Sequence, residues 1–283
     1  MFTTLIDVPS LDCLIGEGNL VLFDCSFELS DPSAGLARYL SGHLPNAHYL
    51  HLEKQLSGLP DGTNGRHPLP DRSVLANILR AAGLSNDQQV VVYDDSDGAY
   101  AARLWWLVRW LGHSAVAVLD GGKRTWTAYG MLIETGMPSS IKGNFQPSVY
   151  SGQAVVDANS VLANIEDGDS FILDARSPER FRGDTNPIDP VPGHIPGARN
   201  RFFKDNLTPE GQFKDAAGLR AEFAALIGEK KPADIVLQCG SGVTACHNAL
   251  AMEIAGLGGA ALYPGSWSEW ISDRRRPIAK KTG

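Results

Sequence analysis

The chain has 283 residues, of which 43% are hydrophobic and 20% are charged, and its formal net charge is −7. This length accommodates two domains of ordinary size, and the composition is typical of a globular protein. The acidic balance argues against a nucleic-acid partner. The chain shows no secretory signal and no apolar run long enough to span a bilayer, so we expect a cytoplasmic protein that does not enter the membrane.

Short apolar segments alternate with helical segments along the first half of the chain. Residues 21–24, 90–93 and 115–119 have the composition of buried strands. Residues 74–82 carry apolar side chains at helical spacing, whereas residues 57–70 form a long polar loop of the kind that is often functional. This alternation predicts a parallel sheet that is covered by helices on both faces.

The second half of the chain repeats the first. The Gly-His-x-Pro turn at His43 recurs at His194, and Trp126 and Trp270 are separated by 144 residues, as are Gly98 and Gly242. We therefore predict an α/β protein with two tandem domains, each a parallel sheet flanked by helices on both faces. The expected bounds are residues 1–135 for the first domain, 136–152 for a linker and 153–283 for the second domain.

The stretch Cys239-Gly-Ser-Gly-Val-Thr follows a strand-like run and precedes a segment with helical spacing. Gly240 and Gly242 allow the loop to curl so that its N–H groups converge on one point, to which the following helix adds the positive end of its dipole. A cysteine in such a loop is expected to react as a thiolate. The amide ring would then hold a second sulfur atom or an oxyanion.

The two repeats differ at this thiol. The spacing of 144 residues places Asp95 at the position of Cys239, so the first domain is predicted to be catalytically inactive and to line one wall of the site. A cysteine phosphatase would need an arginine six residues after the cysteine, because the guanidinium binds phosphate oxygens in pairs. Ala245 occupies that position, which makes phosphatase chemistry a poor interpretation.

The repeats, the Gly-His-x-Pro turns and the Cys-Gly-Ser-Gly-Val-Thr loop together resemble the tandem-domain rhodanese-type sulfurtransferases, over nearly the whole chain. Within this superfamily the uncharged loop is similar to the 3-mercaptopyruvate branch, because the thiosulfate branch carries basic residues there. The resemblance implies an inactive first domain, an active second domain and a site between them. It implies no metal and no organic cofactor.

The resemblance also implies roles for individual residues. Cys239 matches the nucleophile that becomes a persulfide, and Ser241 matches a loop serine that acts with a histidine and an acid. His67 and Glu53 fall at the positions of that histidine and acid, although the family usually has Asp where Glu53 stands. Arg180 matches an arginine that binds the anionic end of the substrate, and the remaining loop residues line the donor site: Gly240, Gly242, Val243 and Thr244.

One departure from the family pattern concerns the donor. The mercaptopyruvate branch usually has a second arginine after the first, but residues 184–190 contain none. Half of the carboxylate clamp is then missing unless Arg182 or Arg176 replaces it. Thiosulfate therefore stays open as the alternative donor, and a non-enzymatic binding module is a further alternative.

The other cysteines and the paired histidines are interpreted as structural. Cys246 lies on an apolar helical stripe, and Cys13 and Cys25 lie in apolar segments, so all three are predicted to be core residues. His43 and His194 occur in both repeats although only one has the thiol, which favours a structural role. The expected partners are a small-molecule sulfur donor and, as acceptor, a thioredoxin-like thiol or cyanide, with the protein acting as a monomer.

Overall fold

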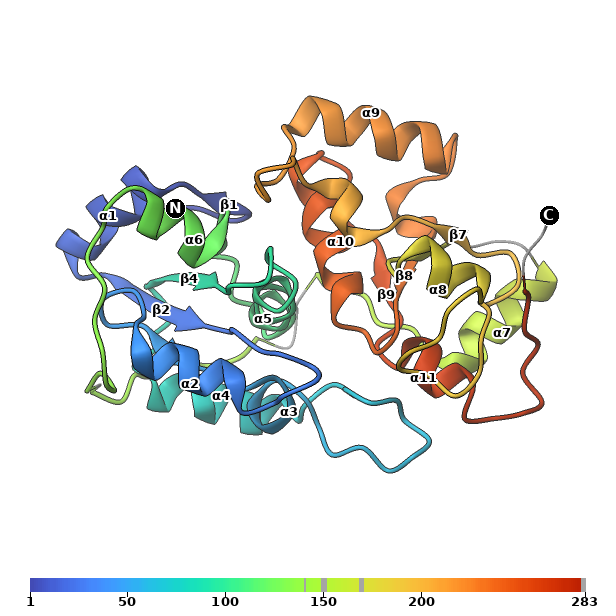
Figure 1. Ribbon diagram of the computed structural model, residues 1–283, viewed down its shortest axis with the longest axis horizontal. Helices are drawn as coiled ribbons and strands as arrows, with labels where there is room; N and C mark the ends of the chain where they lie inside the picture. The colour runs from blue at the N-terminus through green and yellow to red at the C-terminus, as the bar shows by residue number, and fades with distance from the viewer. Residues whose placement is uncertain (140, 149–151, 168–170, 281–283) are drawn as a thin grey trace. The chain divides into compact units, whose positions relative to one another are not determined.

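The computed structural model describes residues 1–139, 141–148, 152–167 and 171–280 (Figure 1). The chain divides into two compact units. The first comprises Met1–Gly58, Pro70–Gly152 and Pro209–Phe213, and the second comprises Leu59–Leu69, Gln153–Thr208 and Lys214–Gly283. Residue 140 and residues 149–151 of the predicted linker lie outside the described residues.

The first unit contains a five-stranded, wholly parallel sheet in the order β1-β5-β4-β2-β3. Its strands are β1 (Leu5–Ile6), β2 (Leu20–Asp24), β3 (His48–Tyr49), β4 (Gln89–Tyr93) and β5 (Val116–Leu119). Its helices are α1 (Val8–Glu17), α2 (Ala34–Ser41), α3 (Leu52–Gln55), α4 (Arg72–Ala81), α5 (Ala101–Trp110) and α6 (Gly122–Ala128).

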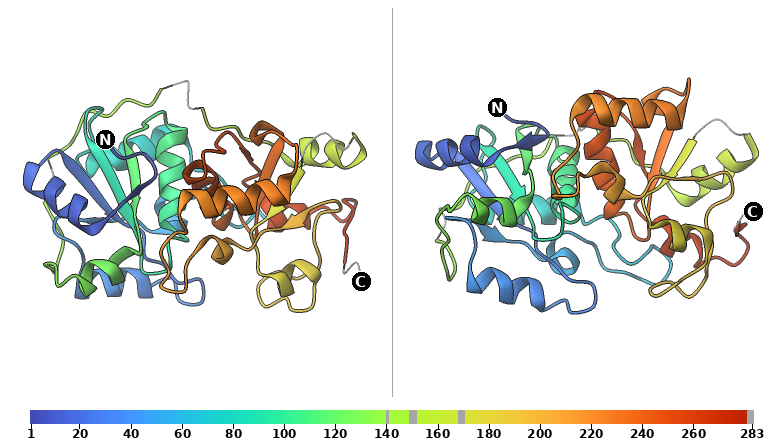
Figure 2. Two further views of the ribbon diagram at one scale, coloured as in Figure 1. Left: turned by 90° about the horizontal axis from the view of Figure 1, so that it is seen from above. Right: turned by 45° about the horizontal axis from the view of Figure 1, so that its top comes forward.

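Both faces of this sheet are buried because side chains alternate along each strand. Leu22 and Val91 pack with Leu11 of α1 and Trp126 of α6 in one core cluster. The intervening strand residues are also buried, and α5 packs against β4 and β5. Figure 2 shows α1 and α5 on opposite sides of the strands. The prediction of a parallel sheet covered on both faces is confirmed.

The second unit contains a four-stranded parallel sheet in the order β7-β6-β8-β9. Its strands are β6 (Phe171–Asp174), β7 (Arg199–Asn200), β8 (Ile235–Gln238) and β9 (Ala261–Leu262). Its α-helices are α7 (Ala158–Asp167), α8 (Pro178–Arg182), α9 (Ala216–Ile227), α10 (Thr244–Ile254) and α11 (Ser266–Trp270), and its 3₁₀ helices are η1 (Phe203–Asn206) and η2 (Pro232–Asp234).

Helices cover both faces of this sheet as well. Val236 of β8 packs with Val161 of α7 and with Trp267 and Trp270 of α11. On the other face α10 packs against β8 and α9, as the second unit in Figure 1 shows. Among the described residues, no helix combines the length and the apolar character that a membrane crossing requires.

Candidate functional site

Cys239 is the first residue after β8, and α10 begins five residues later at Thr244. The thiol-bearing residue is 2% exposed. Its N–H donates to Ser266 Oγ (3.1 Å), and its carbonyl accepts from the N–H of Trp267 (3.0 Å). The next carbonyl, of Gly240, accepts from the N–H of Ser268 (2.9 Å). The predicted strand–loop–helix setting is thus confirmed, and the first turn of α11 fixes the loop in place.

The two loop glycines are required for different reasons. Gly242 has a φ of +76°, and a Cβ atom there would lie 2.3 Å from the carbonyl oxygen of Pro264. A Cβ atom on Gly240 would lie 3.0 Å from Nη2 of Arg180 and 3.0 Å from Nη2 of Arg66. Gly242 therefore permits the turn. Gly240, the residue directly after Cys239, has no side chain and so leaves room for two guanidinium groups.

His67 lies against the same loop, because the segment Leu59–Leu69 belongs to the second unit. Nδ1 of His67 lies 2.7 Å from Oγ of Ser241, and these two residues are 3% and 7% exposed. The segment is tied to α11 and its flank by the N–H of Arg66, which donates to Ser268 Oγ (3.1 Å), and by Ser272 Oγ, which donates to the carbonyl of Thr63 (3.3 Å). The predicted pairing of His67 with Ser241 is therefore present in the structure.

Glu53 is an exposed residue in the first turn of α3, and it belongs to the first unit. Its N–H donates to Nδ1 of His51 (3.2 Å). The role of Glu53 in orienting His67 stays a prediction.

Arg180, the predicted anion-binding residue, is joined by an arginine that sequence reasoning did not assign. Nη2 of Arg180 donates to Oδ2 of Asp189 (2.7 Å), and Nη1 of Arg66 donates to Oδ1 of the same carboxylate. The two residues that the sequence offered as replacements are committed elsewhere: Arg176 to the buried carboxylate of Asp174 (2.7 Å), and Arg182 to Asp184 (2.8 Å).

Arg66 is therefore the second guanidinium beside Gly240, and the two arginines that the sequence left open as replacements, Arg176 and Arg182, do not occupy this place. Arg66 comes from a segment more than a hundred residues earlier in the chain. Its position directly before His67 was the available signal, because a segment that brings one side chain to the loop also brings its neighbour. Asp189 and Ser266 were missed too, and no local motif marks either of them.

The corresponding loop of the first unit follows β4. Tyr93, the last residue of β4, pairs with Asp24, just as Gln238 at the end of β8 pairs with Asp174. Asp94, rather than Asp95, is therefore the counterpart of Cys239, and the prediction was wrong by one residue. The spacing of 144 residues misled because the first loop holds one residue more between this position and Gly98. The conclusion that the first loop carries no thiol at this position is unaffected.

Asp94 fills the first loop with its own carboxylate. Its two oxygens accept the N–H groups of Ser96 and Gly98 (2.8 and 2.9 Å) and of Tyr100 and Ala101 (both 2.8 Å). Burial raises the pKa of Asp94 even though these four bonds lower it. The amides that would bind an external anion in such a loop are satisfied internally.

The remaining cysteines differ in their surroundings. Cys246 is buried and its Sγ donates to the carbonyl of Gly242 (3.4 Å), and Cys25 is buried where desolvation and the charges of Asp24 and Asp94 raise its pKa well above the usual value. Both are core residues, as predicted. Cys13 is exposed, contrary to prediction, because only Val8 and Leu11 of α1 are fully buried and Cys13 lies off that stripe.

The paired histidines have structural surroundings. Nδ1 of His43 lies 2.9 Å from the carbonyl oxygen of Leu44, and its ring stacks on Tyr39. Nδ1 of His194 lies 2.9 Å from the carbonyl oxygen of Phe181, on whose ring it stacks. These contacts support the predicted role of both histidines in fixing the turns.

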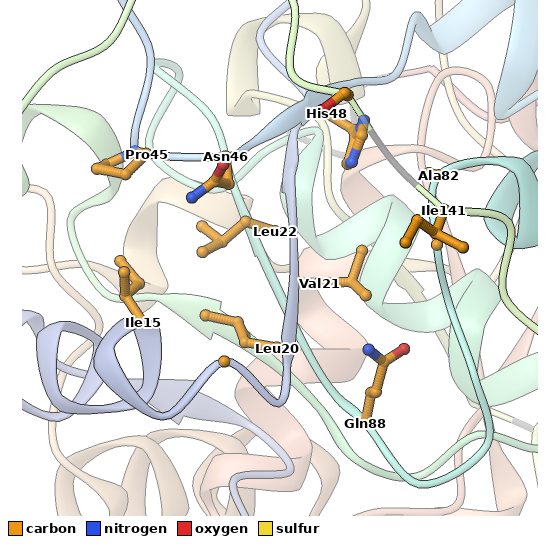
Figure 3. A pocket seen from close by; sticks show the side chains of 13 residues that line it. Ile15, Leu20, Val21, Leu22, Pro45, Asn46, His48, Ala82, Gln88 and Ile141 are labelled. Carbon is orange, nitrogen blue, oxygen red and sulfur yellow. The ribbon is translucent and has the colours of Figure 1, made fainter.

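A pocket of about 340 Å³ lies in the first unit and is lined by none of the predicted site residues (Figure 3). Leu20, Val21 and Leu22 of β2 contribute side chains to it, together with His48 and Ile141. Burial lowers the pKa of His48, which favours the neutral imidazole. The described residues that line this pocket include no cysteine.

Comparisons with known proteins agree with this architecture. The rhodanese-like domain model matches residues 7–129 and again residues 157–273. A Pseudomonas aeruginosa protein named "Probable 3-mercaptopyruvate sulfurtransferase" is 46% identical over 277 residues, covering 97% of both chains. The bovine thiosulfate sulfurtransferase is 34% identical over 263 residues, covering 91% of this chain and 86% of the relative.

Solved structures show the same similarity. The 3-mercaptopyruvate sulfurtransferase of Leishmania major superposes with a TM-score of 0.82 at 29% identity, covering 98% of this chain and 76% of that one. The domain matches together span most of the chain. The protein therefore belongs to the rhodanese-like family and carries the rhodanese-like domain twice.

Proposed function

We propose that the protein is a sulfurtransferase that moves a sulfane sulfur from 3-mercaptopyruvate, through a persulfide on Cys239, to a thiol or to cyanide. The observation that carries this proposal is the set of side chains around the thiol loop. The second unit places His67 and Ser241 at the loop and brings Arg66 and Arg180 beside Gly240. A thiol with a proton-transfer pair and a double arginine suits a donor that has a carboxylate and a transferable sulfur.

In the first half-reaction the Cys239 thiolate attacks the donor sulfur, and the carbon–sulfur bond breaks. The electron pair of that bond passes to the enolate of pyruvate, which takes up a proton to become pyruvate. The His67–Ser241 pair is suited to deliver this proton, since its hydrogen bond is already formed at 2.7 Å. Glu53 would orient the imidazole, and Arg66 and Arg180 would bind the carboxylate.

In the second half-reaction a thiolate or cyanide attacks the outer sulfur of the persulfide. The sulfur–sulfur bond breaks, its electron pair returns to Cys239, and the acceptor leaves with the extra sulfur. Gly240, Gly242, Val243 and Thr244 would surround the persulfide at the start of α10, where the helix dipole favours negative charge. We propose a thioredoxin-like protein as the thiol acceptor, and a monomer acting in the cytoplasm, where cysteines stay reduced.

Mass spectrometry of the intact protein tests the persulfide. After incubation with 3-mercaptopyruvate we expect a mass increase of about 32 Da, the mass of one sulfur atom on a reactive thiolate. Cys239→Ser should show neither this adduct nor sulfur transfer. Cys246→Ser is the matched control, because Cys246 is buried on α10 and we expect it to leave the adduct intact. Sulfur transfer by Cys239→Ser would refute the proposal.

Steady-state kinetics with both donors tests the donor assignment, because thiosulfate is the second candidate and the bovine relative is named for it. We expect a higher kcat/KM with 3-mercaptopyruvate. Arg180→Ala should lower that value about 10- to 100-fold, the worth of a hydrogen bond to a charged group. Arg182→Ala is the control, since Arg182 pairs with Asp184 on the exposed side of α8. A higher kcat/KM with thiosulfate would overturn the donor assignment while leaving sulfur transfer in place.

A further inference from the structure

The carboxylate of Asp189 is buried between the two arginines of the site, and its side chain is 0% exposed. Oδ1 faces Nη1 of Arg66, and Oδ2 accepts from Nη2 of Arg180 at 2.7 Å. Its own backbone carbonyl accepts a hydrogen bond from the side-chain amide of Asn186, which fixes the loop. Because this carboxylate is buried and paired with two guanidinium groups, its negative charge is a permanent part of the charge of the site.

Asp189 uses only part of the hydrogen-bonding capacity of the two arginines. Each guanidinium has five N–H donors. Nη2 of each lies close to Gly240, and the buried Nε atoms of Arg66 and Arg180 have no hydrogen-bond partner among the residues that the structure describes. The Nη2 groups, which lie nearest to the thiol loop, therefore have N–H donors left for an anion bound beside that loop.

We infer that Asp189 determines which donor charge the site accepts, an inference that rests on the proposed function. The cluster of Arg66, Arg180 and Asp189 has a net charge of one positive unit, and the negative charge of the Cys239 thiolate is common to both donors and to every variant. The charge of the cluster matches 3-mercaptopyruvate, whose single carboxylate carries one negative charge, and leaves thiosulfate, with two negative charges, half compensated. Because the side chains of Arg66 and Arg180 are 31% and 18% exposed, solvent screens the mismatch only in part.

The charge count makes opposite predictions for two variants. Asp189→Asn raises the net charge to two positive units and should favour the dianion. Arg66→Gln lowers the net charge to zero and should weaken the dianion more than the monoanion. Coulomb's law with an effective dielectric constant near 20 makes one unit charge at about 10 Å worth roughly a tenfold change in the kcat/KM ratio of the two donors.

The experiment measures kcat/KM for thiosulfate and for 3-mercaptopyruvate in the wild type and in both variants, at constant ionic strength. We expect the thiosulfate-to-mercaptopyruvate ratio to rise about tenfold in Asp189→Asn, and to fall at least about tenfold in Arg66→Gln because that guanidinium would contact the anion directly. Inhibition by sulfate and by pyruvate, a dianion and a monoanion that donate no sulfur, should follow the same order. Asp184→Asn is the matched control, since it removes one negative charge from the exposed pair with Arg182 and should leave the ratio unchanged.

The outcomes separate this inference from the proposed function. The role of Asp189 alone is overturned if the wild type transfers sulfur but the ratio of the two kcat/KM values changes in neither variant. It is also overturned if Asp184→Asn changes that ratio as much as the two variants do. A wild type that takes sulfur from neither donor overturns the proposed function instead. A melting curve would show whether Asp189→Asn folds. If it does not, Arg66→Gln alone tests the inference, because without charge matching its kcat/KM would fall by the same factor for both donors and their ratio would stay constant.

Discussion

Ser266 holds the backbone of Cys239 in place, and the structure lets us estimate the effect of substituting it. Its hydroxyl accepts the N–H of Cys239 (3.1 Å) and donates to the carbonyl of Tyr263 (2.9 Å). Ser266 is completely buried and has a backbone φ of +52°, a value that residues other than glycine rarely adopt. Ser266 therefore makes two side-chain hydrogen bonds while its own backbone is strained.

Ser266→Ala leaves the Cys239 N–H and the Tyr263 carbonyl without this partner. Each unpaired buried polar group costs about 1–3 kcal/mol, so for the two groups we expect Ser266→Ala to lower the free energy of unfolding by about 2–6 kcal/mol. Ser266→Gly loses the same bonds but removes backbone strain of about 1–2 kcal/mol, which offsets the greater flexibility of glycine in the unfolded chain. The glycine variant should therefore be at least as stable as the alanine variant.

Urea unfolding of the full chain, followed by circular dichroism and fluorescence, measures both differences if the slope m is unchanged. The rate of persulfide formation should fall in both variants, because Cys239 loses a contact that fixes its backbone. The reasoning would be refuted if Ser266→Ala unfolded within about 0.5 kcal/mol of the wild type, a change ordinary for a surface site. It would also be refuted if the glycine variant were clearly less stable than the alanine variant.

Three other substitutions test the site and its surroundings. Gly242→Ala should abolish sulfur transfer and lower the melting temperature, because its Cβ atom would lie 2.3 Å from the carbonyl oxygen of Pro264. Gly197→Ala is the control: Gly197 has a φ of +80° but open space around it, so the substitution should cost only about 1 kcal/mol of backbone strain. Burial raises the pKa of Glu269, so the folded state holds the carboxyl proton more tightly than the unfolded state does. The free energy of unfolding therefore falls as the pH rises above 4.5. In urea unfolding, Glu269→Gln should be more stable than the wild type at pH 7 and equally stable at pH 3. His67→Gln should lower kcat with 3-mercaptopyruvate and flatten its pH profile near neutrality, and a kcat that kept its pH dependence would contradict the role of the His67–Ser241 pair.

Much of the fold could be predicted from the sequence because the signals are local. Apolar runs and helical spacing mark the strands and helices within windows of ten residues or so. The internal repeat then indicates two units, and glycines after a buried strand indicate a tight loop with Cys239 at its start. These features depend on neighbours in the chain, and the structure confirms them in β8, the loop and α10.

The composition of the site beyond the thiol depended on contacts between distant segments. Spacing alone aligned Asp95 with Cys239, and only the pairing of β4 with β2 showed that Asp94 is the counterpart. Likewise, residues 184–190 contain no arginine, and nothing local indicates that Arg66 takes the missing place. Such contacts are decided when the chain packs, since side chains far apart in sequence carry no periodicity that relates them.

The sequence by itself determined that two parallel α/β units are present and that Cys239, followed by two nearby glycines, comes directly after a buried strand of the second. The tertiary structure decided what surrounds that cysteine. It brought the segment Leu59–Leu69 into the second unit, joined Arg66 to Arg180 through Asp189, and placed the Ser266 hydroxyl on the Cys239 amide. The reason is physical: backbone conformation and burial are encoded locally, whereas the charge and the hydrogen bonds of a site are set by whichever segments the packed core brings together.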